Sequence, residues 1–100
     1  MRTRGVVFAP DAEDDLSSLY DFIAERASPG TAYHFVARIE TFCRSLSHAA
    51  ERGTHHSNLR KGLRSVGFEG RVTIVFHVDE TTVSVLRVFP AGRNWTEEIG

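Results

Sequence analysis

The segment Ser28-Pro29-Gly30 constrains the fold more than any other part of the chain, because it separates two stretches with helical periodicity. The first stretch runs from Pro10 to about Ala27, and the second begins at Pro29 with Ser28 as a suitable N-cap. A connection this short predicts that the two helices form an antiparallel hairpin. Their apolar stripes are Ala12, Leu16, Leu19, Tyr20 and Ile23, followed by Ala32, Phe35, Val36, Ile39, Phe42, Cys43 and Leu46.

Short β-type runs flank the helical pair. One precedes it, and three more follow a polar stretch from Ser47 to Lys61 that is expected to be an exposed connection. The last two runs carry apolar residues at odd and even positions, which is typical of strands covered on both faces. This order predicts an α+β fold, β-α-α-β-β-β, with the hairpin packed on a small antiparallel sheet and the first strand at an edge or beside the last. The four runs are 4–8, 62–68, 72–78 and 83–89.

Length and composition limit the classes of protein that this chain can belong to. At 100 residues the chain is expected to form one domain, residues 1–100, with the apolar and charged content of a soluble protein. A lone cysteine and the lack of an apolar span or signal peptide favour the cytoplasm. A net charge of −1 argues against extensive contact with nucleic acid, but leaves room for a local basic patch.

The sequence resembles the ParE branch of the RelE/ParE toxin superfamily over nearly its whole length. The resemblance is carried by VFAPDAEDDLSSLYDFIAERASPGTAYHFVARIETFCRSL and then by GLRSVGFEGRVTIVFHVDETTVSVLRVFPAGRN. No single residue in these segments is distinctive, but their order and spacing together are specific for the superfamily. The best-fitting positions are Ala12, Asp15-Leu16, Ser28-Pro29 with Ala32, Gly62-Leu63-Arg64, Gly70-Arg71 and Leu86-Arg87-Val88.

The resemblance implies a bacterial type II toxin neutralised by a cognate, ParD-like antitoxin. ParE-like members are associated with poisoning DNA gyrase, whereas RelE-like members cleave messenger RNA on the ribosome. One scaffold hosts both activities, so the resemblance implies the fold more firmly than the target. The leading hypothesis is a non-enzymatic gyrase inhibitor that needs no cofactor. The alternatives are a ribosome-dependent endoribonuclease and a degenerate member that has lost its toxicity.

A nuclease would need a base, an acid and cations on the scissile phosphate. Arg71 and Arg87 are the candidate cations, and His77 is the nearby candidate base. RelE-like nucleases also use a Tyr or His near the C-terminus, and neither residue type follows Arg87 here. His77 can equally be a structural or surface histidine. The incomplete set favours the inhibitor over the nuclease.

We predict that cations of the later strands and residues of the C-terminal tail contact the target of the toxin. The candidates are Arg64, Arg87, Arg93 and Trp95, since Trp and Arg are enriched among interface residues that dominate binding energy. Each also has a structural interpretation. Arg87 can cover apolar neighbours with its stem and pair with a carboxylate, and Trp95 can fold back over the core. Both interpretations are left open for these two residues.

A helical hairpin on a sheet leaves a groove and a sheet edge, which suit an amphipathic helix and an extended segment of a partner. The resemblance implies that the antitoxin uses its C-terminal half here and binds DNA with its N-terminal half, so the toxin contacts DNA only indirectly. Phe22 lies off the main stripe and is expected to be exposed. The antitoxin-binding candidates are Leu19, Phe22, Ile23, Phe35 and Phe42.

Two further features invite chemical interpretations that the pattern does not favour. His55 and His56 are adjacent, but no third ligand stands at a regular offset, so no metal site is expected. Cys43 lies on the apolar stripe of the second helix and is expected to pack as a small hydrophobic residue rather than act as a nucleophile.

Overall fold

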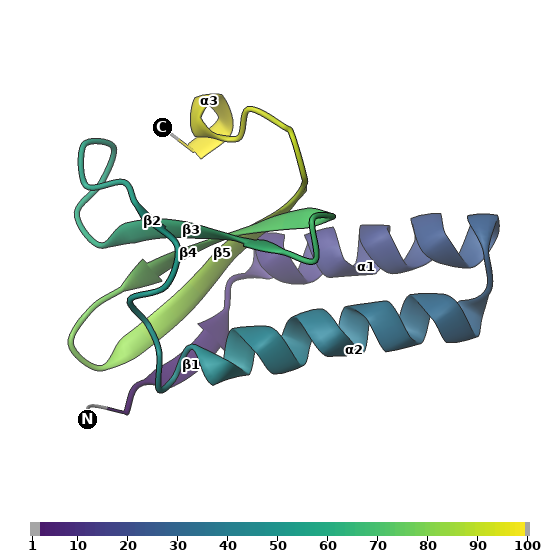
Figure 1. Ribbon diagram of the computed structural model, residues 1–100, viewed down its shortest axis with the longest axis horizontal. Helices are drawn as coiled ribbons and strands as arrows, with labels where there is room; N and C mark the ends of the chain where they lie inside the picture. Colours follow the sequence, from purple (N-terminus) through teal and green to yellow (C-terminus); the bar gives the residue numbers. More distant parts are fainter. Residues whose placement is uncertain (1–2, 100) are drawn as a thin grey trace.

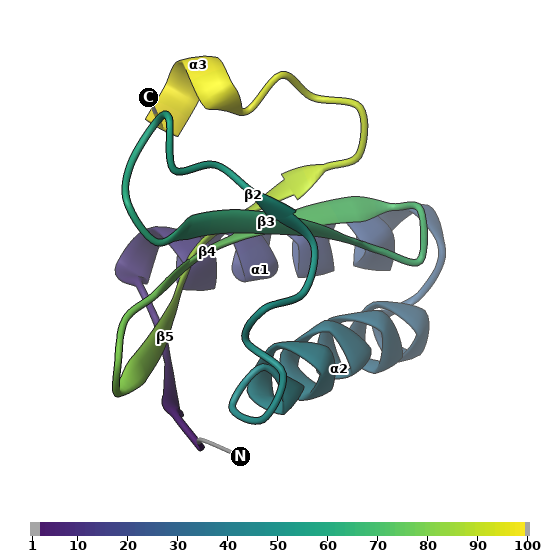
Figure 2. The same cartoon turned by 60° about the vertical axis from the view of Figure 1, so that its left-hand side comes forward.

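The computed structural model describes residues 3–99 as two helices packed on one face of a twisted sheet, with a short C-terminal helix on the opposite side (Figures 1 and 2). The sheet has the strand order β1-β5-β4-β3-β2. This arrangement confirms the expected α+β fold with a helical hairpin. In chain order the elements are β1 (Gly5–Phe8), α1 (Pro10–Arg26), α2 (Pro29–Ser45), β2 (Thr54–His55), β3 (Leu63–Phe68), β4 (Val72–Val78), β5 (Thr82–Pro90) and α3 (Thr96–Ile99).

The two long helices begin and end where local chemistry indicates. In α2 the hydroxyl of Ser28 accepts a hydrogen bond from the backbone N–H of Thr31 at 3.1 Å, which confirms the expected N-cap. Ala9 makes no such cap for α1; Pro10 at the first position and the acidic Asp11 and Glu13 suit that end instead. Only two residues separate the helices, so they return antiparallel, as expected.

The sheet is antiparallel except at one edge. Strand β1 pairs in parallel with β5, with Gly5 opposite Thr82 and Phe8 opposite Val85, so the first strand lies both at an edge and beside the last. The connection from β1 to β5 is long, as a parallel pair requires, and contains the helical hairpin followed by β2, β3 and β4. A register shift between Val75 and Phe76 interrupts the β4–β5 ladder.

Two short elements were not anticipated from the sequence. The polar connection contains β2, where Thr54 and His55 pair with Ser65 and Arg64. Two residues are too few to show strand periodicity, so nothing in the local pattern indicates this strand. The one-turn helix α3 follows Trp95 and is equally brief.

The sheet is covered on both faces, as the apolar patterning of β4 and β5 indicates. The main core lies between the helices and the sheet, where Ile39, Ile74 and Phe76 are fully buried. A smaller second core lies on the other face and consists of Leu63, Val75, Phe89 and Trp95. The C-terminal segment therefore covers the face of the sheet that the helices leave open (Figure 2).

Cys43 is fully buried in the main core. Burial raises the pKa of its thiol to about 12, so the side chain stays protonated and packs as a hydrophobic residue, as expected. None of the helices in the described part of the chain is both long enough and apolar enough to cross a membrane.

Candidate binding groove

A groove of about 590 Å³ lies between α1 and the ends of β4 and β5. This volume is in the range of sites that bind ligands or partner side chains. Its walls are mainly apolar, and the polar groups of the lining include Asp15, Arg71 and Arg93. The apolar lining consists of Leu19, Phe22, Ile23, Phe35, Val72, Val88 and Phe89.

The groove brings together Leu19, Phe22, Ile23 and Phe35, which are all but one of the antitoxin-binding candidates. Phe35 is buried and belongs to the floor, whereas Phe22 is 52% exposed, as its position off the stripe indicates. The guanidinium of Arg26 lies 3.8 Å from the centre of the Phe22 ring. Phe22 is therefore the aromatic side chain of the groove that a partner can reach directly.

Phe42 does not line this groove, so the structure does not bring it together with the other four antitoxin-binding candidates. Its ring packs against Phe68 at 5.1 Å, and both residues line a separate, shallow hollow with Arg38. Phe42 lies two turns after Phe35 on α2, and the rings of both residues pack near Phe68 of β3.

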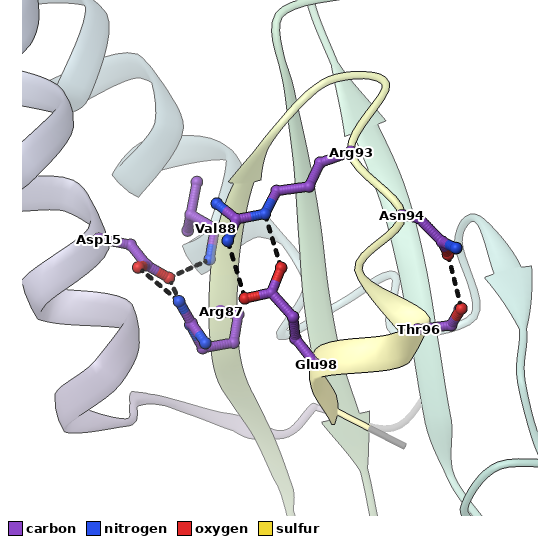
Figure 3. Close-up of polar contacts among 7 residues, drawn as sticks. All are labelled: Asp15, Arg87, Val88, Arg93, Asn94, Thr96 and Glu98. Atoms are coloured by element: carbon purple, nitrogen blue, oxygen red, sulfur yellow. Dashed lines mark hydrogen bonds and ion pairs between the residues drawn. The ribbon is translucent and has the colours of Figure 1, made fainter.

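One carboxylate next to the groove joins α1 to β5 (Figure 3). Asp15 accepts hydrogen bonds from Nε and Nη2 of Arg87 at 2.8 and 3.0 Å. It also accepts the backbone N–H of Val88 at 2.8 Å. The hydrogen bond to Asp15 raises the pKa of the Arg87 guanidinium. Arg87 thus adopts the structural interpretation that the sequence left open: it pairs with a carboxylate, and its guanidinium lies 4.5 Å from the Phe89 ring centre.

Arg93 stands where the groove meets the C-terminal segment. Its guanidinium makes an ion pair with Glu98 of α3, with N–O distances of 2.6 and 2.8 Å (Figure 3). It also lies 5.3 Å from the Phe89 ring centre. Arg93 is half-exposed and remains accessible to a partner, while Arg71 on the other side of the groove is exposed.

The other target-contact candidates are engaged within the fold. Arg64 donates to the carbonyl oxygens of Glu51 and Arg52, both at 3.0 Å, and so holds the polar connection against β3. Trp95 is only 7% exposed and packs in the second core. Of the two interpretations left open for Trp95, the structure thus shows the second, in which the side chain folds back over the core.

The candidate nuclease residues do not form one site. Arg71 directly precedes β4 and His77 lies near its far end, so about 20 Å of strand separate them. Arg87 lies beside Val75 in the middle of the sheet and is already paired with Asp15. Nε2 of His77 donates to the carbonyl of Lys61 at 3.1 Å, a structural role.

The two adjacent histidines, His55 and His56, lie in different environments. His55 is exposed, whereas Nε2 of His56 lies 2.7 Å from the hydroxyl oxygen of Ser65 and its ring meets Trp95 edge-on at 4.8 Å. Burial, together with the nearby His55 and Arg64, lowers the pKa of His56. Within residues 3–99 no group of three metal-ligating side chains comes together.

The family model described as the ParE toxin of the type II toxin–antitoxin system parDE matches residues 6–95. The chain belongs to the ParE toxin family. It is thus a toxin of the type II class, which confirms the expectation drawn from its sequence. No curated protein matches this ParE-family chain.

Two solved toxin–antitoxin structures resemble the ParE-family fold described here. One is the chromosomal ParDE system of P. aeruginosa, with a TM-score of 0.77 and 21% identity over 89% of this chain and 97% of that chain. The other is the RelBE2 toxin–antitoxin complex of Mycobacterium tuberculosis, with a TM-score of 0.62 and 23% identity over 93% of this chain and 97% of that chain. At such identities the likeness shows the common fold, the helical hairpin on the sheet.

Proposed function

We propose that this toxin inhibits DNA gyrase as a protein ligand and that a ParD-like antitoxin neutralises it by occupying the groove beside α1. The exposed Phe22 at an apolar groove carries the proposal, because a monomer leaves this surface open to water. Membership of the ParE family and the resemblance to the ParDE system of P. aeruginosa support the choice of partner and target. Gyrase as the target places the action of the toxin in the cytoplasm.

A binding role fits the side chains better than RNA cleavage. The separation of Arg71 from His77 and the pairing of Arg87 with Asp15 mean that these three residues do not form one set for general acid–base chemistry. Arg93 is our candidate for target contact, since its charge is half-exposed at the groove. An antitoxin in the groove would cover Arg93, which gives neutralisation a simple physical basis.

We expect that producing this chain alone in a bacterial host arrests growth, and that the purified protein blocks supercoiling by gyrase and traps cleaved DNA. An inhibitor of gyrase leaves translation intact at first, so messenger RNA should stay uncut in the same cells. Arrest with normal supercoiling and newly cut messenger RNA would instead establish the endoribonuclease. Normal growth with a folded protein would identify a member that is no longer toxic.

The groove also indicates the chemistry of the antitoxin segment. An amphipathic helix would place apolar side chains against Phe22 and Val72. Arg93 is paired with Glu98, whereas Arg71 is exposed and forms no ion pair within residues 3–99, so an acidic side chain on the segment would meet opposite charge at Arg71. The antitoxin is therefore proposed to bind through a segment that is apolar on one face and acidic at its border.

Phe22→Asp is expected to weaken antitoxin binding by about 2 kcal/mol, roughly 30-fold in Kd, because it places a charge in the apolar groove. The fold should remain intact, since Phe22 is 52% exposed. Titration calorimetry against the cognate antitoxin, with circular dichroism of both proteins, measures the two effects.

The matched control for this substitution is Tyr33→Asp. Tyr33 is an aromatic residue on α2 that is 64% exposed and does not line the groove. Its replacement should leave the Kd unchanged. Equal losses of antitoxin affinity for Phe22→Asp and Tyr33→Asp, or no loss of affinity for either variant, would mean that the antitoxin binds elsewhere on the toxin.

A further inference from the structure

The net charge of −1 hides a strong separation of charge along the molecule. Helix α1 contains six acidic residues and a single arginine. The loop of residues 52–62, here called the basic loop, contains Arg52, Arg60 and Lys61 and no acidic residue. The loop projects from the end of the molecule opposite the α1–α2 turn (Figures 1 and 2).

The basic loop is held in place at both ends by glycines with positive φ. At Gly53, φ is 75° and a Cβ atom would lie 2.0 Å from the carbonyl oxygen of Ser65. At Gly62, φ is 82° and a Cβ atom would lie 2.6 Å from the carbonyl oxygen of Val78. A side chain at either position would push the loop off the sheet, so close backbone contact fixes where the loop emerges.

The loop also closes on itself through its backbone. The N–H of His56 donates to Leu63 at 2.8 Å, and the N–H groups of Leu59 and Arg60 both donate to the carbonyl of His56, at 3.0 and 3.2 Å. An exposed, polar segment without a place in either core is thus nevertheless ordered by its own contacts. Such loops on a rigid scaffold are where binding residues are commonly found.

The cations of the basic loop differ from the three arginines that form ion pairs among residues 3–99. Arg38, Arg87 and Arg93 are each paired with a carboxylate. Arg52, Arg60 and Lys61 are exposed, and no carboxylate within residues 3–99 forms an ion pair with any of them. The guanidinium of Arg52 also lies 5.4 Å from the centre of the Phe42 ring, but it has no ion-pair partner there. Three cations without ion pairs on an ordered loop form a surface that attracts an anion from outside the molecule.

We propose that the basic loop binds the phosphate backbone of duplex DNA directly and without sequence preference. Phosphate contacts come from Arg and Lys and from small polar side chains, and Thr54, Ser57 and Asn58 stand exposed between the cations. Leu59 is the one large apolar residue of the loop, so the loop lacks the aromatic anchors that a protein partner would need. The acidic α1 is repelled by DNA, which orients the loop toward it.

The contact extends the proposed function without depending on it. An inhibitor that acts on gyrase works beside DNA, and a loop on the backbone would hold the toxin there while the groove remains available to other partners. The antitoxin has no part in this contact, in contrast to the indirect contact that family resemblance implies.

The test is fluorescence anisotropy of a labelled 20-base-pair duplex titrated with the purified full chain, in the absence of gyrase. Three phosphate contacts should weaken the affinity about 40-fold between 50 and 200 mM salt. The double variant Arg60→Gln/Lys61→Gln should reduce this factor to about 4-fold, since one contact remains. Its affinity at 50 mM salt should also be clearly lower than that of the wild type.

The matched control is Arg26→Gln/Arg38→Gln, which removes the same charge from the helices and should retain the steep salt dependence. Equal effects of the two double variants would overturn the proposal, because binding would then follow net charge alone. Tighter binding to an RNA duplex of the same length would assign the loop to RNA, and no binding to either duplex would also overturn it. Because gyrase is absent, failure here leaves the inhibition of supercoiling to be judged by its own assay.

Discussion

Asp15→Ala is expected to lower the free energy of unfolding by about 2 to 3 kcal/mol, although Asp15 lies in the polar first half of α1. The carboxylate of Asp15 accepts three hydrogen bonds from β5, two from Arg87 and one from the N–H of Val88. Its removal leaves a part-buried guanidinium and a backbone donor without their partner. The side chains of Arg87 and Asp15 are 26% and 17% exposed, which places the loss below that of a fully buried pair.

The position of this carboxylate explains why the effect is larger than for other charged pairs. Strand β1 pairs with β5 only as far as Val85, so backbone N–H groups of β5 beyond that residue need a hydrogen-bond acceptor other than β1. Asp15 provides it for Val88, and Pro90, two residues further on, has no N–H to satisfy. The pair therefore closes an open strand edge as well as balancing a charge.

Urea unfolding followed by circular dichroism measures the loss, and a fall in Tm of roughly 10 to 20 °C should accompany it. The control is Glu69→Ala, which breaks the ion pair with Arg38 on the surface. With side-chain exposures of 52% and 37%, that pair is screened by solvent and its loss should change stability little. If the two variants lose the same amount, Asp15 has no special role at the edge of β5.

The arrangement of elements was accessible from the sequence because its signals are local. The break at Ser28-Pro29-Gly30 lies between two stretches of helical periodicity, and Pro10 lies at a helix start. In β4 and β5 apolar residues occupy odd and even positions alike, which likewise indicated strands covered on both faces. What periodicity could not indicate was β2, where two residues pair only because Gly53 allows close approach to β3.

The sequence predicted the surroundings of a site residue only where the periodicity of a single helix determines whether that residue is exposed. Phe22 lies off the stripe of α1, and it is exposed in the groove as expected. The partner of Arg87 lies 72 positions away in the chain, and no local pattern selects Asp15 among the acids of α1. For the same reason no local pattern indicated where Phe42 packs or decided between the two interpretations of Trp95, since the element against which each one packs is distant in sequence.

Trp95→Ala is expected to have the second large effect, a loss of about 3 kcal/mol in the free energy of unfolding. Trp95 is 7% exposed and closes the second core over Leu63, Val75 and Phe89. In addition, the Trp95 ring packs edge-on against the ring of His56, which lies in the polar segment between α2 and β3. Truncation leaves a cavity that the short α3 cannot fill, because few other apolar side chains in the C-terminal segment pack on the sheet.

The loss should be concentrated in the C-terminal segment, and limited trypsin digestion under native conditions tests this. Release of the segment exposes the bond after Arg93, so Trp95→Ala should be cut there at least about tenfold faster than the wild type, at a rate set by local opening. Tyr33→Ala is the control, because a 64% exposed ring contributes little and cleavage should be unchanged. Unaltered cleavage in Trp95→Ala would mean that the ion pair between Arg93 and Glu98 holds the segment without the tryptophan, and Glu98→Gln would then be the substitution that releases it.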